Sequence, residues 1–202
     1  MGVAEGAADG LELGPVTQEQ VEAYEYGLAR FLDEARVLAQ FQSPATVRVA
    51  RFLEANGTAY LVMELESGQA LSEVIRHAAP LPEERVRQLA VALLRGLEVV
   101  HDKGYLHRDV KPQNIVVRED GSPVLLDFGA ARSSLASQDA GMTVMFTPGY
   151  APFEQYTSTQ TLGPWTDIYA VGATLFHALS ARAPAAVTDR SAARDAGAPD
   201  VV

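Results

Sequence analysis

The sequence predicts an α+β fold, in which one β-hairpin near the N-terminus precedes a longer and mainly helical part. Asn56-Gly57 lies between two strand-like runs, and this dipeptide is a strong signal for a hairpin turn. Apolar residues recur every three or four positions along 83–101 and 167–180, as in helices that bury one face. The hydrophobic share of 48% is typical of a globular protein.

The first part of the sequence predicts one helix before the hairpin and one after it. Residues 1–20 are rich in glycine and lack a periodic pattern, which predicts a linker or disordered segment. Residues 21–41 carry an apolar stripe at helical spacing, so we expect a helix there. The hairpin follows over 47–65. A short helix is expected near 71–78, with Ser72 as its N-cap.

The second part begins with a long helix over 83–101. Pro82 and two acidic residues suit its first turn, and Gly104 ends it. The remaining expectations are short strands at 115–117 and 124–126, a loop over 129–163, a helix over 167–180 and a disordered tail at 184–202.

Composition narrows the function classes. The chain has 16 basic and 26 acidic residues and a formal net charge of −10, which argues against a nucleic-acid partner. The absence of cysteine excludes disulfides and Cys-ligated zinc or iron–sulfur sites. The apolar runs are shorter than a membrane span, and the N-terminus lacks the pattern of a signal peptide. We therefore expect a cytoplasmic protein with no membrane segment.

Two short motifs carry the chemistry. The stretch HRDVKPQN spans 107–114, and DFG follows at 127–129. Together they place an acid, a cation, an amide and a second acid on two neighbouring loops. Phosphoryl transfer uses such a set: a carboxylate accepts the proton of the attacking hydroxyl, a lysine offsets phosphoryl charge, and oxygen ligands hold Mg²⁺. Each residue alone suits an ordinary turn or cap, whereas the joint pattern is rare by chance.

These motifs resemble those of the protein kinase family, and in particular the eukaryotic-like serine/threonine kinases of bacteria. TPGYAPFE at 147–154 is similar to the end of an activation segment, and DIYAVG at 167–172 to the start of the central helix of the large lobe. FLDEA at 31–35 resembles the regulatory helix, and AYLVME at 59–64 the strand that leads into the hinge. The resemblance implies a bilobal protein-kinase-like fold, with an incomplete small lobe at 21–66 and a large lobe at 67–183.

The resemblance also implies catalytic roles. Asp109 is expected to be the catalytic base and Lys111 the contact to the γ-phosphate of ATP. Asn114 and Asp127 are expected to bind Mg²⁺. Thr147, together with Lys111, indicates a serine or threonine acceptor in a protein substrate.

Other residues are expected to bind the nucleotide or to regulate the site. For the adenine they are the gatekeeper Met63, the hinge backbone of Glu64 and Glu66, and Val116 beneath the ring. For regulation they are Glu34 as the ion-pairing acid, Arg108 as the partner of a phosphate on the activation segment, Phe128 and Gly129 of the metal-binding loop, Glu154 at the end of the segment, and Asp167 as a helix cap or a support of the catalytic loop.

The chain also departs from the family pattern. Its first lysine is Lys103, and Gly6, Gly10 and Gly14 do not form a GxGxxG loop. We therefore expect a fragment of a kinase domain that binds ATP weakly. Two alternatives stay open: an inactive, pseudokinase-like scaffold, and a small-molecule phosphotransferase of kinase-like fold. The second does not typically show Lys111 or the 147–154 segment in this setting.

Overall fold

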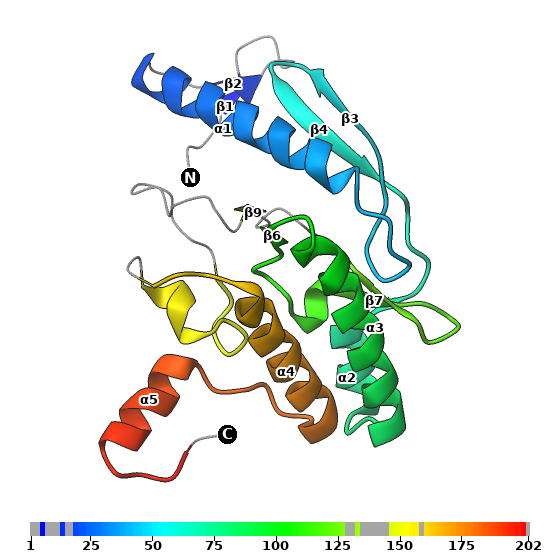
Figure 1. Cartoon of the computed structure of the whole chain (residues 1–202), viewed down its shortest axis with the longest axis vertical. Coiled ribbons are helices and arrows are strands. Elements are labelled where there is room, and N and C mark those ends of the chain that lie inside the picture. Colours follow the sequence, from blue (N-terminus) through cyan, green and yellow to red (C-terminus); the bar gives the residue numbers. More distant parts are fainter. Residues whose placement is uncertain are drawn as a thin grey trace. The chain divides into compact units, whose positions relative to one another are not determined.

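The structure, a computed structural model, describes residues 5–6, 13–14, 18–127, 132–133, 146–157 and 160–200. The chain forms two compact units, drawn in Figure 1. The smaller comprises Met1–Gln42 and Arg48–Leu65, and the larger comprises Ser43–Val47 and Glu66–Val202. The predicted α+β class is confirmed, since a hairpin and a long helix make up the smaller unit and helices dominate the larger.

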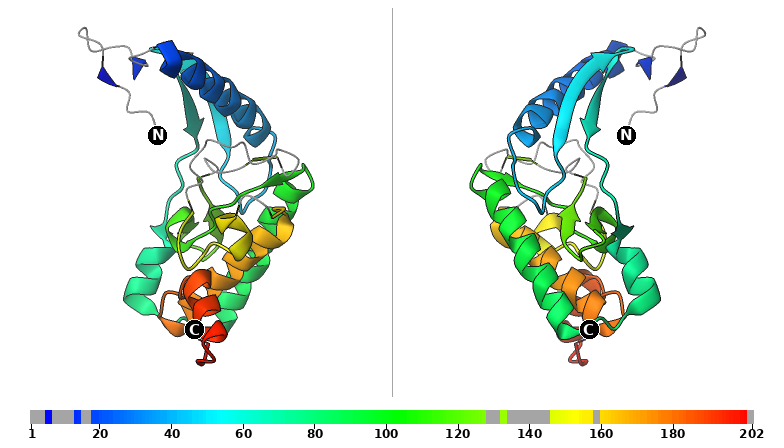
Figure 2. Two further views of the ribbon diagram at one scale, coloured as in Figure 1. Left: turned by 90° about the vertical axis from the view of Figure 1, so that its left-hand side faces the viewer. Right: turned by 90° about the vertical axis from the view of Figure 1, so that its right-hand side faces the viewer.

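The smaller unit consists of one helix packed on one hairpin. Helix α1 (Gln18–Leu38) lies along strands β3 (Val49–Ala55) and β4 (Thr58–Met63), as both views of Figure 2 show. The strands are antiparallel, and both turn residues, Asn56 and Gly57, have positive φ. This is the two-residue turn that the sequence predicts.

The segment expected to be a linker also holds a pair of short strands. β1 (Glu5–Gly6) pairs antiparallel with β2 (Leu13–Gly14). Helix α1 starts at Gln18, three residues before the predicted position. The polar residues ahead of the apolar stripe are helical as well. The expected linker is therefore shorter than 1–20.

Four helices and five short strands make up the described part of the larger unit. The helices are α2 (Leu71–Ala78), α3 (Glu83–His101), α4 (Pro164–Ser180) and α5 (Val187–Asp195). The strands β5 (Gln69–Ala70), β7 (Ile115–Val117) and β8 (Pro123–Leu125) form one antiparallel sheet, and β6 (Tyr105–Leu106) pairs with β9 (Arg132–Ser133). Two 3₁₀ turns are η1 (Pro112–Asn114) and η3 (Phe153–Tyr156).

The core of the larger unit lies between α3 and α4. Leu89, Leu93 and Leu97, which repeat at helical spacing on α3, are fully buried. They belong to one apolar cluster with Val171 and Ala178 of α4. Apolar burial of this kind stabilises the helix pair, which in turn supports the loops at its ends.

Three local expectations were wrong. Ala70, not Ser72, occupies the N-cap position of α2, and no side chain caps that end. Asp167 is not a helix cap, because α4 begins at Pro164 with Gly163 as its N-cap. The tail at 184–202 is not wholly irregular, since α5 lies within it and is held by an ion pair described below.

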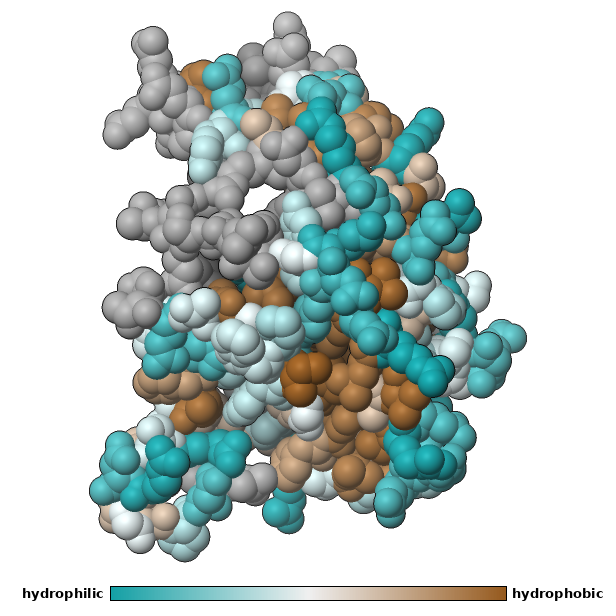
Figure 3. Space-filling model, in the orientation of Figure 1, coloured by the Kyte–Doolittle hydropathy of each residue, from teal (hydrophilic) through white to brown (hydrophobic). Residues whose placement is uncertain are grey.

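Apolar side chains also reach the surface. Figure 3 shows them gathered on one face of the larger unit, over α3 and α4. The exposed large apolar side chains on these helices are Val91, Leu94, Trp165, Ile168 and Leu179. Within the described ranges, no helix has the length and hydrophobicity that crossing a membrane requires.

Candidate active site

The stretch 107–114 runs from β6 through the turn η1 into β7, and the Asp109 carboxylate is its focus. Asp109 Oδ1 accepts a hydrogen bond from Thr147 Oγ1 at 3.0 Å. Asp109 Oδ2 accepts one from Asn114 Nδ2 at 2.9 Å and lies 2.7 Å from Lys111 Nζ. Three of the residues predicted from the sequence therefore converge on the fourth.

A further contact closes this cluster. Lys111 Nζ donates a hydrogen bond to Thr147 Oγ1 at 2.9 Å, so lysine, threonine and aspartate form a triangle. Asn114 Nδ2 also donates to the backbone carbonyl of Asp109 at 2.9 Å. The side chains of Asp109 and Lys111 are 17% and 20% exposed, so their charges interact in a partly desolvated setting.

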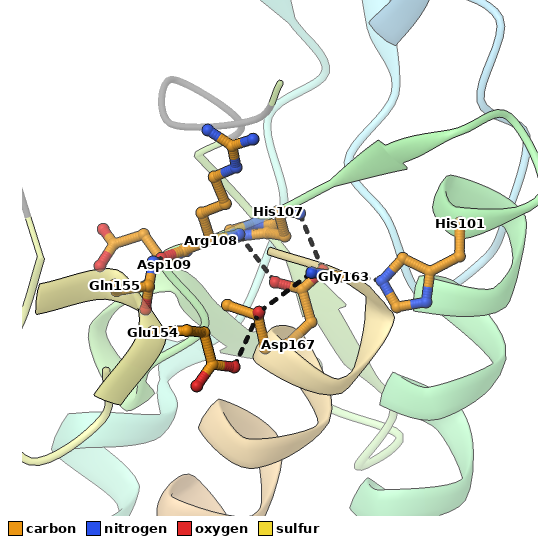
Figure 4. Close-up of polar contacts among 9 residues, drawn as sticks. His101, His107, Arg108, Asp109, Glu154, Gln155, Gly163 and Asp167 are labelled. Carbon is orange, nitrogen blue, oxygen red and sulfur yellow. Dashed lines mark hydrogen bonds and ion pairs between the residues drawn. The ribbon is translucent and has the colours of Figure 1, made fainter. Parts of the chain in front are cut away.

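Asp167 holds the loop in place from the first turn of α4. Its fully buried carboxylate accepts hydrogen bonds from the backbone N–H of His107 at 2.9 Å and of Arg108 at 2.8 Å, as Figure 4 shows. The Nε2 of His101 lies 2.7 Å from the same carboxylate. The backbone at Arg108 has a φ of 67°, an uncommon conformation that these contacts stabilise.

His107 is itself fully buried and supports the loop through hydrogen bonds of its imidazole ring. Burial lowers the pKa of His107, so the neutral imidazole is favoured. The backbone N–H of Asp109 donates to His107 Nδ1 at 3.3 Å, which makes Nδ1 the acceptor. The proton is therefore on Nε2, which donates to the carbonyl oxygen of Leu126 at 2.9 Å. This joins the loop to Leu126, the residue that follows β8 and directly precedes Asp127.

Sequence reasoning missed two contributors to this site. Gln155 Nε2 donates to the backbone carbonyl of Arg108 at 2.9 Å. Thr166 Oγ1 donates to Glu154 Oε1 at 3.0 Å, and the N–H of Gly163 donates to the same hydroxyl at 3.3 Å. Glu154 is thus tied to the start of α4. Neither Gln155 nor Thr166 carries a signal in the sequence, since such polar residues in loops and helix starts are ordinarily solvated.

The residues expected to bind nucleotide fall in both units. In the smaller unit, Met63 ends β4, and the next residue, Glu64, pairs with Arg48 at 3.4 Å. In the larger unit, Glu66 pairs with Arg118, and Val116 is half-buried on β7.

The residues expected to bind metal lie in the larger unit. Asn114 is buried, and Asp127 is exposed with a positive φ. Phe128, Gly129 and the side chain of Glu34, which lies on α1, fall outside the described residues.

Comparison with known families tests the resemblance that the sequence motifs indicate. The family described as "Protein kinase domain" matches residues 16–198. The chain belongs to the protein kinase family. The resemblance noted in the sequence is therefore confirmed, and so is the kinase-like fold class.

Curated kinases are similar over most of this kinase domain. Serine/threonine-protein kinase PknA of Nostoc sp. is 33% identical over 81% of the chain and 30% of its own length. Serine/threonine-protein kinase pkn2 of Myxococcus xanthus is 37% identical, over 77% of the chain and 19% of its own length. Sperm motility kinase 3A of Mus musculus is 31% identical, over 84% of the chain and 33% of its own length. The chain thus spans a third or less of these relatives.

Proposed function

We propose that this chain is part of an ATP-dependent protein serine/threonine kinase, which transfers the γ-phosphate of ATP to a Ser or Thr hydroxyl. The observation that carries the proposal is the convergence of Lys111, Asn114 and Thr147 on the carboxylate of Asp109. Kinase catalysis consists mainly of positioning and charge stabilisation. The proposed domain bounds are 21–66 for the small lobe and 67–183 for the large.

Asp109 is proposed as the catalytic base. Its three donors fix the plane of the carboxylate, and so fix the direction in which it accepts the proton of the substrate hydroxyl. The ammonium of Lys111 is proposed to contact the γ-phosphate and offset its charge in the transition state. Thr147 bridges both groups, so the segment at 146–157 is coupled to the base.

Asn114 and Asp127 suit a magnesium ion. Asn114 uses Nδ2 for both of its bonds to Asp109, which leaves the amide oxygen as a ligand. The Asp127 carboxylate is exposed two residues after β8. One amide and one carboxylate oxygen fit Mg²⁺, which takes its other ligands from water and from phosphate. Bound there, Mg²⁺ would supply charge neutralisation for the phosphates.

The other proposed roles follow the family resemblance. Met63, Glu64, Glu66 and Val116 are proposed to surround the adenine. Asp167 and Glu154 are proposed to hold the catalytic loop and the end of the activation segment. The proposed regulatory residues are Glu34, Arg108, Phe128 and Gly129.

A second candidate function is that of an inactive scaffold. The first 102 residues contain no lysine, whereas a kinase uses a small-lobe lysine to contact the α- and β-phosphates. Arginine is a poor replacement, because its fork is wider than an ammonium group. Weak ATP binding and slow transfer by this chain would follow.

Asp109→Asn tests the proposal. With ATP, Mg²⁺ and a generic basic protein, we expect transfer to fall by roughly 10²- to 10⁴-fold, while circular dichroism stays unchanged. Asp102→Asn, an exposed residue after α3, is the matched control. A wild-type chain that binds Mg-ATP without transfer would favour the scaffold, and a fully active Asp109→Asn variant would exclude Asp109 as the base.

A further inference from the structure

A hollow lies in the larger unit, apart from the catalytic cluster. It is a pocket of about 420 Å³ between α5 and the segment that includes η3 and α4. Phe153 of η3 and Tyr169 of α4 line one side, and Arg190, Ser191 and Arg194 of α5 line the other. In Figure 1, α5 is drawn in orange-red below the yellow segment that contains η3. The pocket therefore combines two guanidinium groups with aromatic side chains.

The chain's own Asp200 occupies the charged end of this pocket. Arg190 Nε donates to Asp200 Oδ1 at 2.9 Å, and Arg190 Nη2 donates to Asp200 Oδ2 at 2.6 Å. This two-bond geometry is the one in which arginine recognises a carboxylate. The hydrogen bonds from Arg190 and the nearby charge of Arg194 lower the pKa of Asp200, so its anionic form is favoured.

The charges in the pocket do not balance. Two arginines, Arg190 and Arg194, face the one carboxylate of Asp200. The hydrogen bonds of Asp200 come from Arg190, and within the described residues Arg194 makes no side-chain hydrogen bond or ion pair. Asp200 lies beyond the end of α5 and is half exposed, so it can leave without disturbing buried apolar groups. The positive charge of the two arginines thus exceeds the negative charge of Asp200, so the pocket can bind a second anionic group. Asp200 itself can be displaced by such a group.

An apolar hollow continues from the charged end. It has a volume of about 270 Å³ and shares Tyr169 and Arg190 with the first. Phe176 and Pro184 lie on its walls. Phe153, on the rim of the first pocket, directly follows the segment 147–152. A peptide with an acidic residue beside an apolar one would fill both hollows next to that segment.

We propose that Arg190 and Arg194 form a docking pocket for an acidic side chain of a protein ligand, and that Asp200 fills this pocket until such a ligand displaces it. That the ligand is a substrate rests on the proposed kinase function, whereas binding itself does not. The site is formed by α5, the helix that sequence analysis did not predict.

Fluorescence anisotropy on the full chain without ATP tests this proposal. The probe is a labelled peptide that contains Glu-Glu followed by Leu and Phe, and its Gln-Gln version is the neutral control. Asp200→Asn removes the competing carboxylate, and we expect the acidic peptide to bind roughly tenfold more tightly. Arg194→Gln should weaken binding several-fold, and Arg190→Gln should nearly abolish it.

Arg182→Gln is the matched control, because Arg182 is exposed and lies outside both pockets. It should leave the affinity unchanged. Equal affinity of wild type and Asp200→Asn, equal loss in Arg182→Gln and Arg194→Gln, or equal binding of the neutral peptide would each overturn the proposal. If circular dichroism shows that Arg190→Gln loses helical structure, the affinity of the Arg194→Gln variant for the acidic peptide decides the test. A kinase that proves inactive leaves this binding result unaffected.

Discussion

Arg118 and Glu66 form a two-bond ion pair in the larger unit, with Nε to Oε2 at 2.8 Å and Nη2 to Oε1 at 2.9 Å. The third nitrogen, Nη1, donates to the carbonyl oxygen of Pro44 at 2.9 Å. Pro44 and Glu66 belong to the two segments by which the chain enters the larger unit. One guanidinium group therefore ties both entry segments to the end of β7.

The first prediction concerns this ion pair. Arg118→Lys should lower the free energy of unfolding by about 1–2 kcal/mol, because a lysine keeps the charge but loses the fork geometry. Urea unfolding measures the change. Arg87→Lys is the control, since Arg87 pairs with Glu84 in a similar geometry but both side chains are more than half exposed. An equal loss of unfolding free energy in both variants would show that the two-bond geometry of Arg118 with Glu66 adds no stability.

The second prediction concerns the hydroxyl of Thr147. Thr147→Val keeps the shape but removes the bridge between Lys111 and Asp109, so kcat should fall by roughly 10- to 100-fold. Thr147→Ser retains the hydroxyl and should recover most of the rate. Steady-state phosphotransfer assays distinguish the two variants. Equal rates for both would contradict a role for the hydroxyl.

The third prediction concerns Asp167. Asp167→Asn should reduce the free energy of unfolding by about 2–3 kcal/mol, because one of the two backbone donors then faces an NH₂ group in a buried site. Chemical denaturation provides the measurement. Asp102→Asn, which alters an exposed carboxylate, should have no measurable effect. Wild-type stability in Asp167→Asn would argue against the carboxylate as a structural acceptor.

The fourth prediction concerns pH. Burial holds the pKa of His107 below its ordinary value of 6.5, so below that pH the unfolded chain takes up a proton that the folded chain resists. The free energy of unfolding should therefore fall as the pH drops below about 6.5, by at most about 1.4 kcal/mol per pH unit from this residue. Burial also lowers the pKa of His177 and adds in the same direction.

Denaturation series in buffers on either side of pH 6.5 test this dependence. His177→Phe should reduce the slope but not abolish it, which isolates the part due to His107. Stability that rises on acidification through this range would be the opposite of what a buried neutral histidine requires.

Local signals predicted much of the fold. The Asn56-Gly57 turn and the apolar stripe of α3 are properties of neighbouring residues, and both appear where expected. The tail was misjudged because its helix has few large apolar residues, and the pairing of Arg190 with Asp200 joins residues ten apart. No local pattern signals such a contact.

In the candidate site, too, local motifs predicted some residues, whereas other contacts depend on the folded chain. The motifs located Asp109, Lys111 and Asn114 because they lie close together in the sequence, and the family resemblance added Thr147. The cap role of Asp167 was wrong, because Gly163 occupies the N-cap position of α4. Its other expected role, support of the catalytic loop, stays a prediction that the bonds from the backbone of His107 and Arg108 favour. The contacts of Gln155 and Thr166 required the folded chain, because their partners are set by the packing of α4 against the loop.

The buried carboxylate on α4 should also limit how the loop at 107–114 opens. The amide hydrogens of His107 and Arg108 are bonded to a helix that belongs to the core, so they can exchange with solvent deuterium only when that helix end separates from the loop. In native-state hydrogen exchange, these two amides should be protected to nearly the same extent as the centre of α3, although they lie in a loop. The stretch that holds the proposed base would then open only together with the core.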